Sequence, residues 1–111
     1  MNSVVLIGNL TRDPDVRYTT SNDPVCVAKF SLAINSGYGD NQRTAYPEIV
    51  VFGKQAENCE RFLSKGAKVC VSGEIQTGSY EKDGNKIYIT NVKANKVEFL
   101  STAKKDEWQI P

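Results

Sequence analysis

Apolar residues recur in short runs along the chain, and several of these runs have the period of two that is typical of strands. In the clearest run, residues 25–35, alternate positions are apolar, namely Cys26, Ala28, Phe30, Leu32 and Ile34. This alternation predicts a strand with one face in a core and the other facing outward. Residues 3–10 form a more continuous apolar run, which predicts a strand covered on both faces.

Three further strands are predicted along the chain, at 44–52, 69–80 and 87–99. Pro47 lies inside the first of them and has no amide donor, so this strand should lie at a sheet edge or be bulged there. The turn sequence Lys82-Asp83-Gly84-Asn85 predicts a hairpin that joins the last two strands.

One short amphipathic helix is predicted between the third and fourth strands. Apolar side chains recur at helical spacing within 54–65, and Gly66 follows as the expected C-terminal cap. Three strands, one helix and two strands fit an all-β chain with one short helix, folded as an OB-fold, a five-stranded Greek-key barrel. We therefore predict one OB-fold domain at 1–100 and a short C-terminal tail at 101–111. Such barrels commonly bind oligonucleotides or oligosaccharides on an open strand face and its loops.

Composition argues for a binding protein. The chain has no histidine, no clustered carboxylates and no metal-ligand spacing, so we expect neither an enzyme nor a metal or cofactor site. The net charge is only +1, from 14 Lys and Arg against 13 Asp and Glu, so any phosphate binding must depend on local placement of cations. The apolar runs are too short for a membrane helix, and no basic secretory start is present, which predicts a cytoplasmic protein.

The three cysteines are too few and too far apart for a disulfide framework. Cys26 and Cys59 fit the core faces of their segments, whereas Cys70 has the opposite parity to its apolar neighbours and faces a subunit contact or solvent. Residues of such outward parity are Val25, Val27, Cys70 and Val92. An apolar outer face of this kind predicts a partner subunit.

Four aromatic residues lie where burial is not expected. Tyr38 and Tyr80 occur in polar, glycine-containing segments, and Tyr46 and Phe52 have the parity opposite to the core residues of the third strand. A single exposed ring is ordinary on a protein surface. Four together indicate a stacking surface, whose ligand could be a sugar, a protein or a nucleic acid.

Several blocks of the sequence match one known family. The run Val4-Val5-Leu6-Ile7-Gly8-Asn9-Leu10, followed by Asp13-Pro14-Asp15-Val16-Arg17-Tyr18, resembles the opening of bacterial single-stranded DNA-binding proteins. Later blocks of that family are similar to 30–33, 50–54 and 71–73, in the same order. The resemblance implies sequence-independent binding and protection of single-stranded DNA in replication, recombination and repair. It also implies a homotetramer associated with the nucleoid in the cytoplasm.

The resemblance also implies which residues bind. The family's base-stacking positions are filled here by Tyr38, Tyr46, Phe52 and Tyr80. The candidates for phosphate contacts come from position and not from the resemblance, because most of them flank the proposed face or its loops: Arg17, Lys29, Arg43, Lys54, Lys82 and Lys86. Tyrosine offers less stacking area than the tryptophan that the family often has, and Glu48, Gln76, Gly78 and Ser79 stand where the family tends to be basic. Binding weaker than the family pattern is therefore expected.

The C-terminal residues Ile110 and Pro111 resemble the start of the family's apolar tip, which recruits replication and repair proteins, although no final phenylalanine follows. Trp108 either serves such a partner or packs on its own barrel.

Two other functions stay open from the residues. An OB barrel with exposed rings can bind oligosaccharides, and an OB-fold relative of the primosome can act mainly as a protein-interaction module with weak single-strand binding.

Overall fold

Strand pairing closes the chain into a ring. The computed structural model describes residues 1–101. Its strands are β1 (Val4–Leu10), β2 (Asp15–Tyr18), β3 (Cys26–Ser36), β4 (Arg43–Ala45), β5 (Glu48–Phe52), β6 (Lys68–Lys82) and β7 (Asn85–Ser101). A 3-10 turn, η1 (Gly39–Asn41), and one helix, α1 (Lys54–Phe62), complete the described elements.

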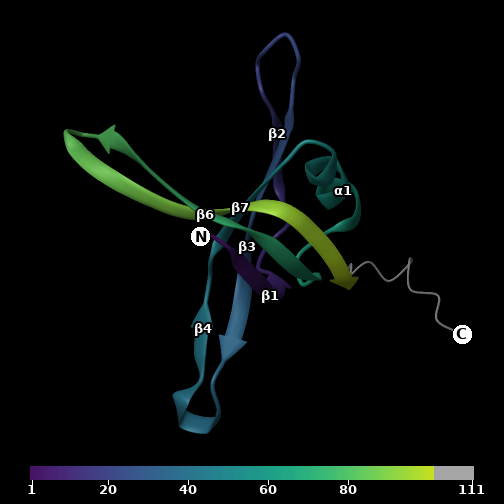
Figure 1. Cartoon of the computed structure of the whole chain (residues 1–111), viewed down its shortest axis with the longest axis vertical. Helices are drawn as coiled ribbons and strands as arrows, with labels where there is room; N and C mark the ends of the chain where they lie inside the picture. The colour runs from purple at the N-terminus through teal and green to yellow at the C-terminus, as the bar shows by residue number, and fades with distance from the viewer. Residues whose placement is uncertain (102–111) are drawn as a thin grey trace, which may run out of the picture.

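The ring consists of β1, β3, β5, β7 and β6 in spatial order. β1 pairs with both β3 and β6, β6 with β7, β7 with β5, and β5 with β3, so the pairings return to their starting strand. The β5–β7 pairing is parallel and the others are antiparallel. The predicted all-β, OB-type architecture with one short helix is confirmed. Three arms project from the ring in Figure 1: the β2–β3 loop, the β3–β4 loop and the β6–β7 hairpin.

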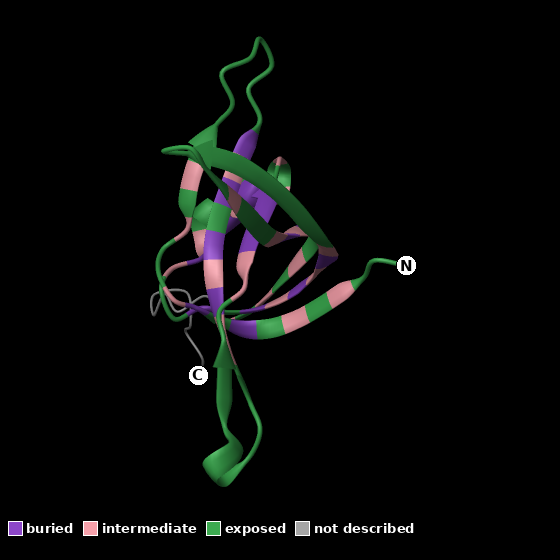
Figure 2. Cartoon of the chain, turned by 90° about the vertical axis from the view of Figure 1, so that its left-hand side faces the viewer, coloured by how far each residue is buried: buried purple, intermediate pink, exposed green. Residues whose placement is uncertain are grey.

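The core lies inside the ring. Its largest fully buried side chains are Phe30, Leu32, Ile49, Val51, Val69, Val71 and Cys59. α1 adds Ala56 and Cys59 and packs against β3, β5 and β2. Burial is concentrated in the body of the ring, whereas the arms are exposed (Figure 2). Cys26 and Cys59 are buried, as predicted, and Cys70 is half-buried.

One face of β1 is open, which corrects the prediction of a strand covered on both faces. Val5 and Ile7 are 65% and 50% exposed, while Gly8 and Leu10 are buried. The continuous apolar run cannot distinguish a strand that is covered on both faces from one that borders a single core.

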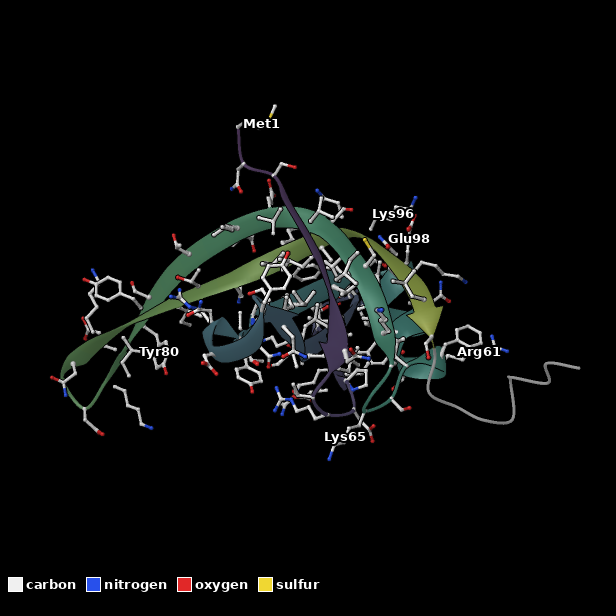
Figure 3. All side chains as sticks on the ribbon, turned by 90° about the horizontal axis from the view of Figure 1, so that it is seen from below. Met1, Arg61, Lys65, Tyr80, Lys96 and Glu98 are labelled. Atoms are coloured by element: carbon white, nitrogen blue, oxygen red, sulfur yellow. The ribbon has the colours of Figure 1, made fainter. Side chains whose placement is uncertain are left out.

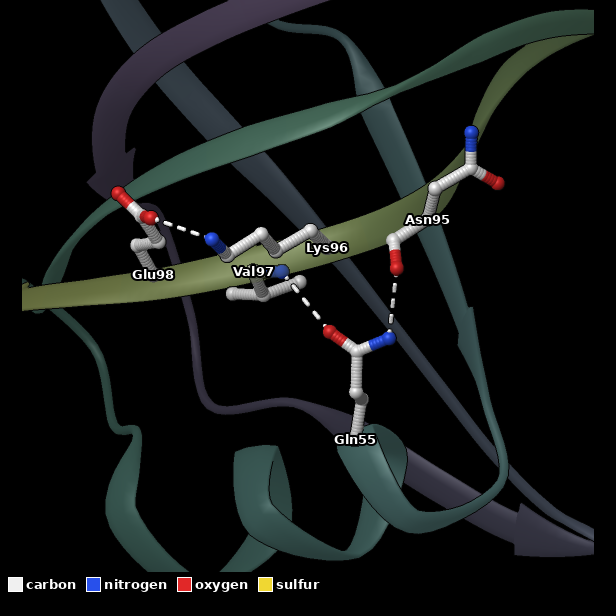
Figure 4. A network of polar contacts seen from close by, with 5 residues as sticks. All are labelled: Gln55, Asn95, Lys96, Val97 and Glu98. Carbon is white, nitrogen blue, oxygen red and sulfur yellow. Dashed lines mark hydrogen bonds and ion pairs between the residues drawn. The ribbon is translucent and has the colours of Figure 1, made fainter.

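A β-bulge divides β7. Ser72 pairs with Lys96 but Gly73 pairs with Ala94, so Asn95 is an extra residue in β7. The Gln55 side chain bridges it, because its Nε2 donates to the Asn95 carbonyl oxygen at 2.8 Å and its Oε1 accepts from the Val97 amide at 2.9 Å (Figure 4).

The bulge also reverses which alternate positions of β7 face the core. Val92 and Ala94 are buried before it, whereas Val97 and Phe99 pack against the core after it. The prediction that Val92 faces outward is therefore wrong, because Val92 is only 6% exposed. Val25, which shared that prediction, is 40% exposed.

α1 is shorter than predicted. It ends at Phe62, and Leu63 has extended backbone dihedrals while its amide bonds to the Cys59 carbonyl oxygen at 2.9 Å. Gly66 is consequently not the helix cap; its amide donates to the Leu10 carbonyl oxygen at 2.9 Å in the turn that leads to β6. No helix within residues 1–101 is long and apolar enough to cross a membrane.

Pro47 divides the predicted third strand into β4 and β5 without adding a residue. Ile34 pairs with Ala45 and Ser31 with Glu48, so the two halves keep one register against β3. Pro47 accepts a hydrogen bond from the Leu32 amide at 3.1 Å. The sequence predicted either a sheet edge or a bulge at Pro47. The edge is correct, since β4 pairs only with β3 among the described strands.

The predicted hairpin turn is confirmed. Asp83 and Gly84 have φ of 55° and 81°, and the strands on either side pair from Lys82 and Asn85 onward. Two successive positive φ values define the type I′ turn that matches the twist of paired strands.

Candidate functional site

The outer face of β2, β3, β5 and β7 carries the candidate site. Residues directly opposite each other in paired strands share a face of the sheet. One cross-strand row is therefore Arg17, Val27 and Phe52, and the next is Asp15, Lys29, Val50 and Lys93. The register thus brings two predicted phosphate contacts, Arg17 and Lys29, close to the predicted stacking residue Phe52.

A hollow of about 320 Å³ lies in this face, lined by Asp15, Arg17, Val27 and Lys29. Arg17 Nε lies 3.4 Å from Asp15 Oδ1, and the two side chains are 82% and 50% exposed. An exposed ion pair of this kind is worth less than about 1 kcal/mol, so Arg17 can exchange Asp15 for another anion at little cost.

Phe52 ends β5 with its ring on the outer face. The residue is 43% exposed, whereas Ile49 and Val51, which have the opposite parity, are fully buried. Lys93 Nζ lies over the ring, 5.7 Å from its centroid, within the usual range of a cation–π contact. Lys93 was not among the sequence candidates, since the parallel β5–β7 pairing that brings it to Phe52 leaves no local signal in the sequence.

Tyr46 shares the outward parity of Phe52 and is 66% exposed. It lies just before Pro47, at the junction between β4 and β5, where the chain keeps its register against β3. Lys54 begins α1, two residues after Phe52, and is exposed. These residues extend the outer face around Phe52 toward the β3–β4 arm and toward the helix.

Tyr38 and Arg43 lie on the β3–β4 arm. Tyr38 is 91% exposed and precedes η1, where its carbonyl oxygen accepts from the Asn41 amide at 2.9 Å. Arg43 begins β4, opposite Ser36, and is also exposed. This arm extends away from the ring in a different direction from the β6–β7 hairpin (Figure 1), so Tyr38 is not brought together with Tyr80 within one chain.

The β6–β7 hairpin has two different faces. Tyr80 is 49% exposed and pairs with Ile87, so it shares a face with Lys82, two residues further along β6. Figure 3 shows Tyr80 on the part of this hairpin that projects from the ring, far from Lys96 and Glu98 at the other end of the β6–β7 pair.

Lys86 lies on the opposite face of the hairpin from Tyr80. Its Nζ is 5.5 Å from the centroid of the Tyr88 ring, and Tyr88 is 74% exposed. Tyr88 was not among the stacking residues predicted from the sequence. The hairpin turn was a usable signal for this ring, because strand residues close to a long hairpin's tip extend beyond any core.

Two shifted pKa values belong to the packing between β2, β3 and α1. Burial raises the pKa of the Cys59 thiol to about 12, so this thiol stays protonated and unreactive near neutral pH. A hydrogen bond with the Cys26 thiol raises the pKa of the Tyr18 phenol. Cys59 is fully buried, whereas Tyr18, which pairs with the buried Cys26, is itself 55% exposed.

The strands form a closed sheet, and its outer face carries exposed aromatic side chains and cations. This combination defines an OB-type binding protein. The family model described as "Single-strand binding protein family" matches residues 1–100. The chain belongs to this family.

Relatives in three bacterial genera support this assignment, each named single-stranded DNA-binding protein. A Bacillus cereus protein is 43% identical over 90% of this chain and 60% of its own length. A Staphylococcus aureus protein is 42% identical over 98% of this chain and 71% of its own length, and a Listeria innocua protein is 44% identical over 92% and 65%. The chain thus spans about 60% of the length of the Bacillus relative.

The predictions about the tail, for Trp108, Ile110 and Pro111, concern positions outside the described residues 1–101.

Proposed function

We propose that this protein binds single-stranded DNA without reading its sequence, and so protects exposed strands during replication, recombination and repair. The observation that carries the proposal is the outer face around Phe52. There an exposed ring lies among cations in a member of the single-strand binding protein family.

Stacking supplies the selectivity for unpaired strands. A flexible single strand offers base faces that a duplex keeps stacked, and every base can lie on an aromatic ring. Phe52 and Tyr46 provide two such rings on the outer face, since both are exposed and share one strand parity. Each stacked base contributes about 1–3 kcal/mol, so a few rings are sufficient for stable binding.

The two arms extend the proposed surface beyond the ring of strands. Tyr38 with Arg43 on one arm, and Tyr80 with Lys82 on the other, repeat the combination of ring and cation. Because the arms point in different directions, one strand must bend around the protein to reach both. Lys86 and Tyr88 offer a further combination on the second face of the hairpin.

Electrostatics contributes less than is usual for a nucleic-acid-binding protein. The net charge of +1 supplies little attraction over long distances, so phosphate contacts must come from local cations such as Arg17, Lys29 and Lys54. We therefore expect stacking to account for a large share of the affinity and the salt dependence to be moderate.

Self-association is part of the proposal. Val5 and Ile7 on β1 and Leu100 on β7 are 65%, 50% and 45% exposed. Half-buried Cys70 lies between β1 and β7 on the same outer face, where it pairs with Ile7. Lys96 and Glu98 of β7, which form an exposed ion pair at 2.9 Å, lie on the same face, so it combines apolar and charged side chains. Exposed apolar side chains next to such charges favour contact between copies of the chain. We propose that the protein is a homotetramer that acts on nucleoid DNA in the cytoplasm. Light scattering would then give a mass four times that of the 12.3 kDa chain.

A titration of intrinsic tyrosine and tryptophan fluorescence tests the proposed function. The ligands are an oligo-thymidine strand, longer than the about 4–16 nucleotides that one OB fold occludes, and a duplex of the same length. We expect quenching and saturation with the single strand at several salt concentrations, and much weaker binding of the duplex. Equal affinity for the duplex, or no binding of either, contradicts the proposal.

A further inference from the structure

Lys93 lies at a central position on the outer face. It belongs to β7, just before the bulge, where it pairs with Val50 of β5 on one side and with Glu74 of β6 on the other. The residue is half-buried. Val50 lies between Lys29 and Lys93 and is only 6% exposed, so the outer-face side chains around it cover it. A lysine stem can provide such cover while its ammonium group stays accessible.

The Lys93 ammonium group is directed toward Phe52. Nζ lies 5.7 Å from the ring centroid although Glu74 is its direct neighbour across the β6–β7 pair. A cation at this distance is attracted by the negative face of the ring and restricts the ring's motion. Phe52 is 43% exposed with Lys93 in place, so part of the ring is open to a ligand.

Positive side chains therefore flank Phe52 on two sides. Lys29 of β3 and Lys93 of β7 both pair with Val50 of β5, from opposite sides of that strand. Neighbouring strands are about 4.8 Å apart, so these two backbones are separated by about 10 Å across the sheet. A nucleotide whose base covers the Phe52 ring has its backbone between or beside these two cations.

We propose that Lys93 is a phosphate contact of the single-strand surface, and that it also orients the Phe52 ring for a stacked base. This inference rests on the proposed function, and it assigns to β7 a cation that the sequence candidates did not include. It also accounts for how a chain of low net charge can direct positive charge to its stacking ring.

The salt dependence of single-strand binding tests the inference. Each phosphate contact to a single strand adds about 0.7 to the slope of log K against log salt concentration. We expect Lys93→Gln to reduce this slope by about 0.7, which weakens oligo-thymidine binding about eightfold near 50 mM salt and about threefold near 200 mM. Lys93→Arg keeps the charge and should keep the slope.

Lys65→Gln is the matched control, because Lys65 is an exposed lysine in the turn after α1 (Figure 3). It should leave the slope unchanged, and urea unfolding of each variant establishes that the fold is intact. If the wild type binds but Lys93→Gln keeps its slope, Lys93 makes no phosphate contact and the inference is wrong. An affinity loss that is equal at all salt concentrations also overturns it, since it leaves only a structural role. Failure of the wild type to bind contradicts the proposed function instead.

Discussion

Replacing Phe52 with alanine separates a binding role from a packing role. The ring ends β5 on the outer face, 43% exposed, with the Lys93 ammonium group over it. Its strand neighbours Ile49 and Val51 are fully buried in the core. The substitution therefore removes a surface for stacking but leaves the apolar residues on the other face of β5 in place.

The two expected effects have different magnitudes. Loss of one stacked base costs about 1–3 kcal/mol of binding free energy, which corresponds to a dissociation constant about 5- to 150-fold larger. Phe→Ala in a core costs about 3–5 kcal/mol of unfolding free energy, and for a half-exposed ring we expect about half of that. Because domains of this size are stable by about 5–15 kcal/mol, Phe52→Ala should remain folded.

Anisotropy of a labelled oligo-thymidine strand measures the binding, and urea unfolding measures the stability. Phe30→Ala is the matched control, because Phe30 lies in the neighbouring strand β3 and is fully buried. It should lose stability by the full core amount. If Phe52→Ala binds within about twofold of the wild type, the ring is not part of the site. If it unfolds as readily as Phe30→Ala, the ring belongs to the core.

Two further predictions concern the framework of the site. Gly73→Ala should lower the free energy of unfolding in urea by about 1–3 kcal/mol, because a Cβ at this position overlaps the Lys93 carbonyl oxygen. Gly78→Ala on the same strand is the control and should be nearly neutral, because a Cβ there meets no atom. Equal stabilities of the two variants would contradict the register at the bulge. Burial raises the pKa of Cys59 from 9.0 to about 12, so folding favours the protonated thiol. Stability is fully present below pH 9 and should fall at up to about 1.4 kcal/mol per pH unit from there toward pH 12. Cys59→Val should lose this dependence, and an unchanged pH profile in that variant would refute the assignment.

Much of the fold is readable from the sequence where one strand face meets one core. The alternation in 25–35 predicts β3 and its buried face because that strand is regular throughout the core. Asp83 and Gly84 predict the hairpin because a type I′ turn requires positive φ at both positions. The open face of β1 is not readable, since an apolar residue such as Val5 has the same pattern whether or not another chain covers it.

The candidate site was predictable to the same extent. The outward direction of Tyr46 and Phe52 follows from parity, because Pro47 interrupts the ladder without changing the register. Lys93 and the division of the hairpin into two faces depend on pairings between distant segments, which a single sequence does not reveal. The bulge itself left a trace, since the apolar positions change phase between Ala94 and Val97.

That change of phase determines which way Lys93 faces. Lys93, Val97 and Phe99 share one parity in the sequence, and in a regular strand with Val97 and Phe99 on the core side, Lys93 would point inward as well. Because Asn95 is an extra residue, the side chains before it point to the opposite face from the one they would have in a regular strand. Val92 is therefore buried, and Lys93 reaches the Phe52 ring. Gln55 holds this bulge from the first turn of α1, directly after the segment that carries Phe52. The same irregularity therefore completes the core and places a cation at the stacking ring, and this links the packing of the helix to the charge of the proposed DNA surface.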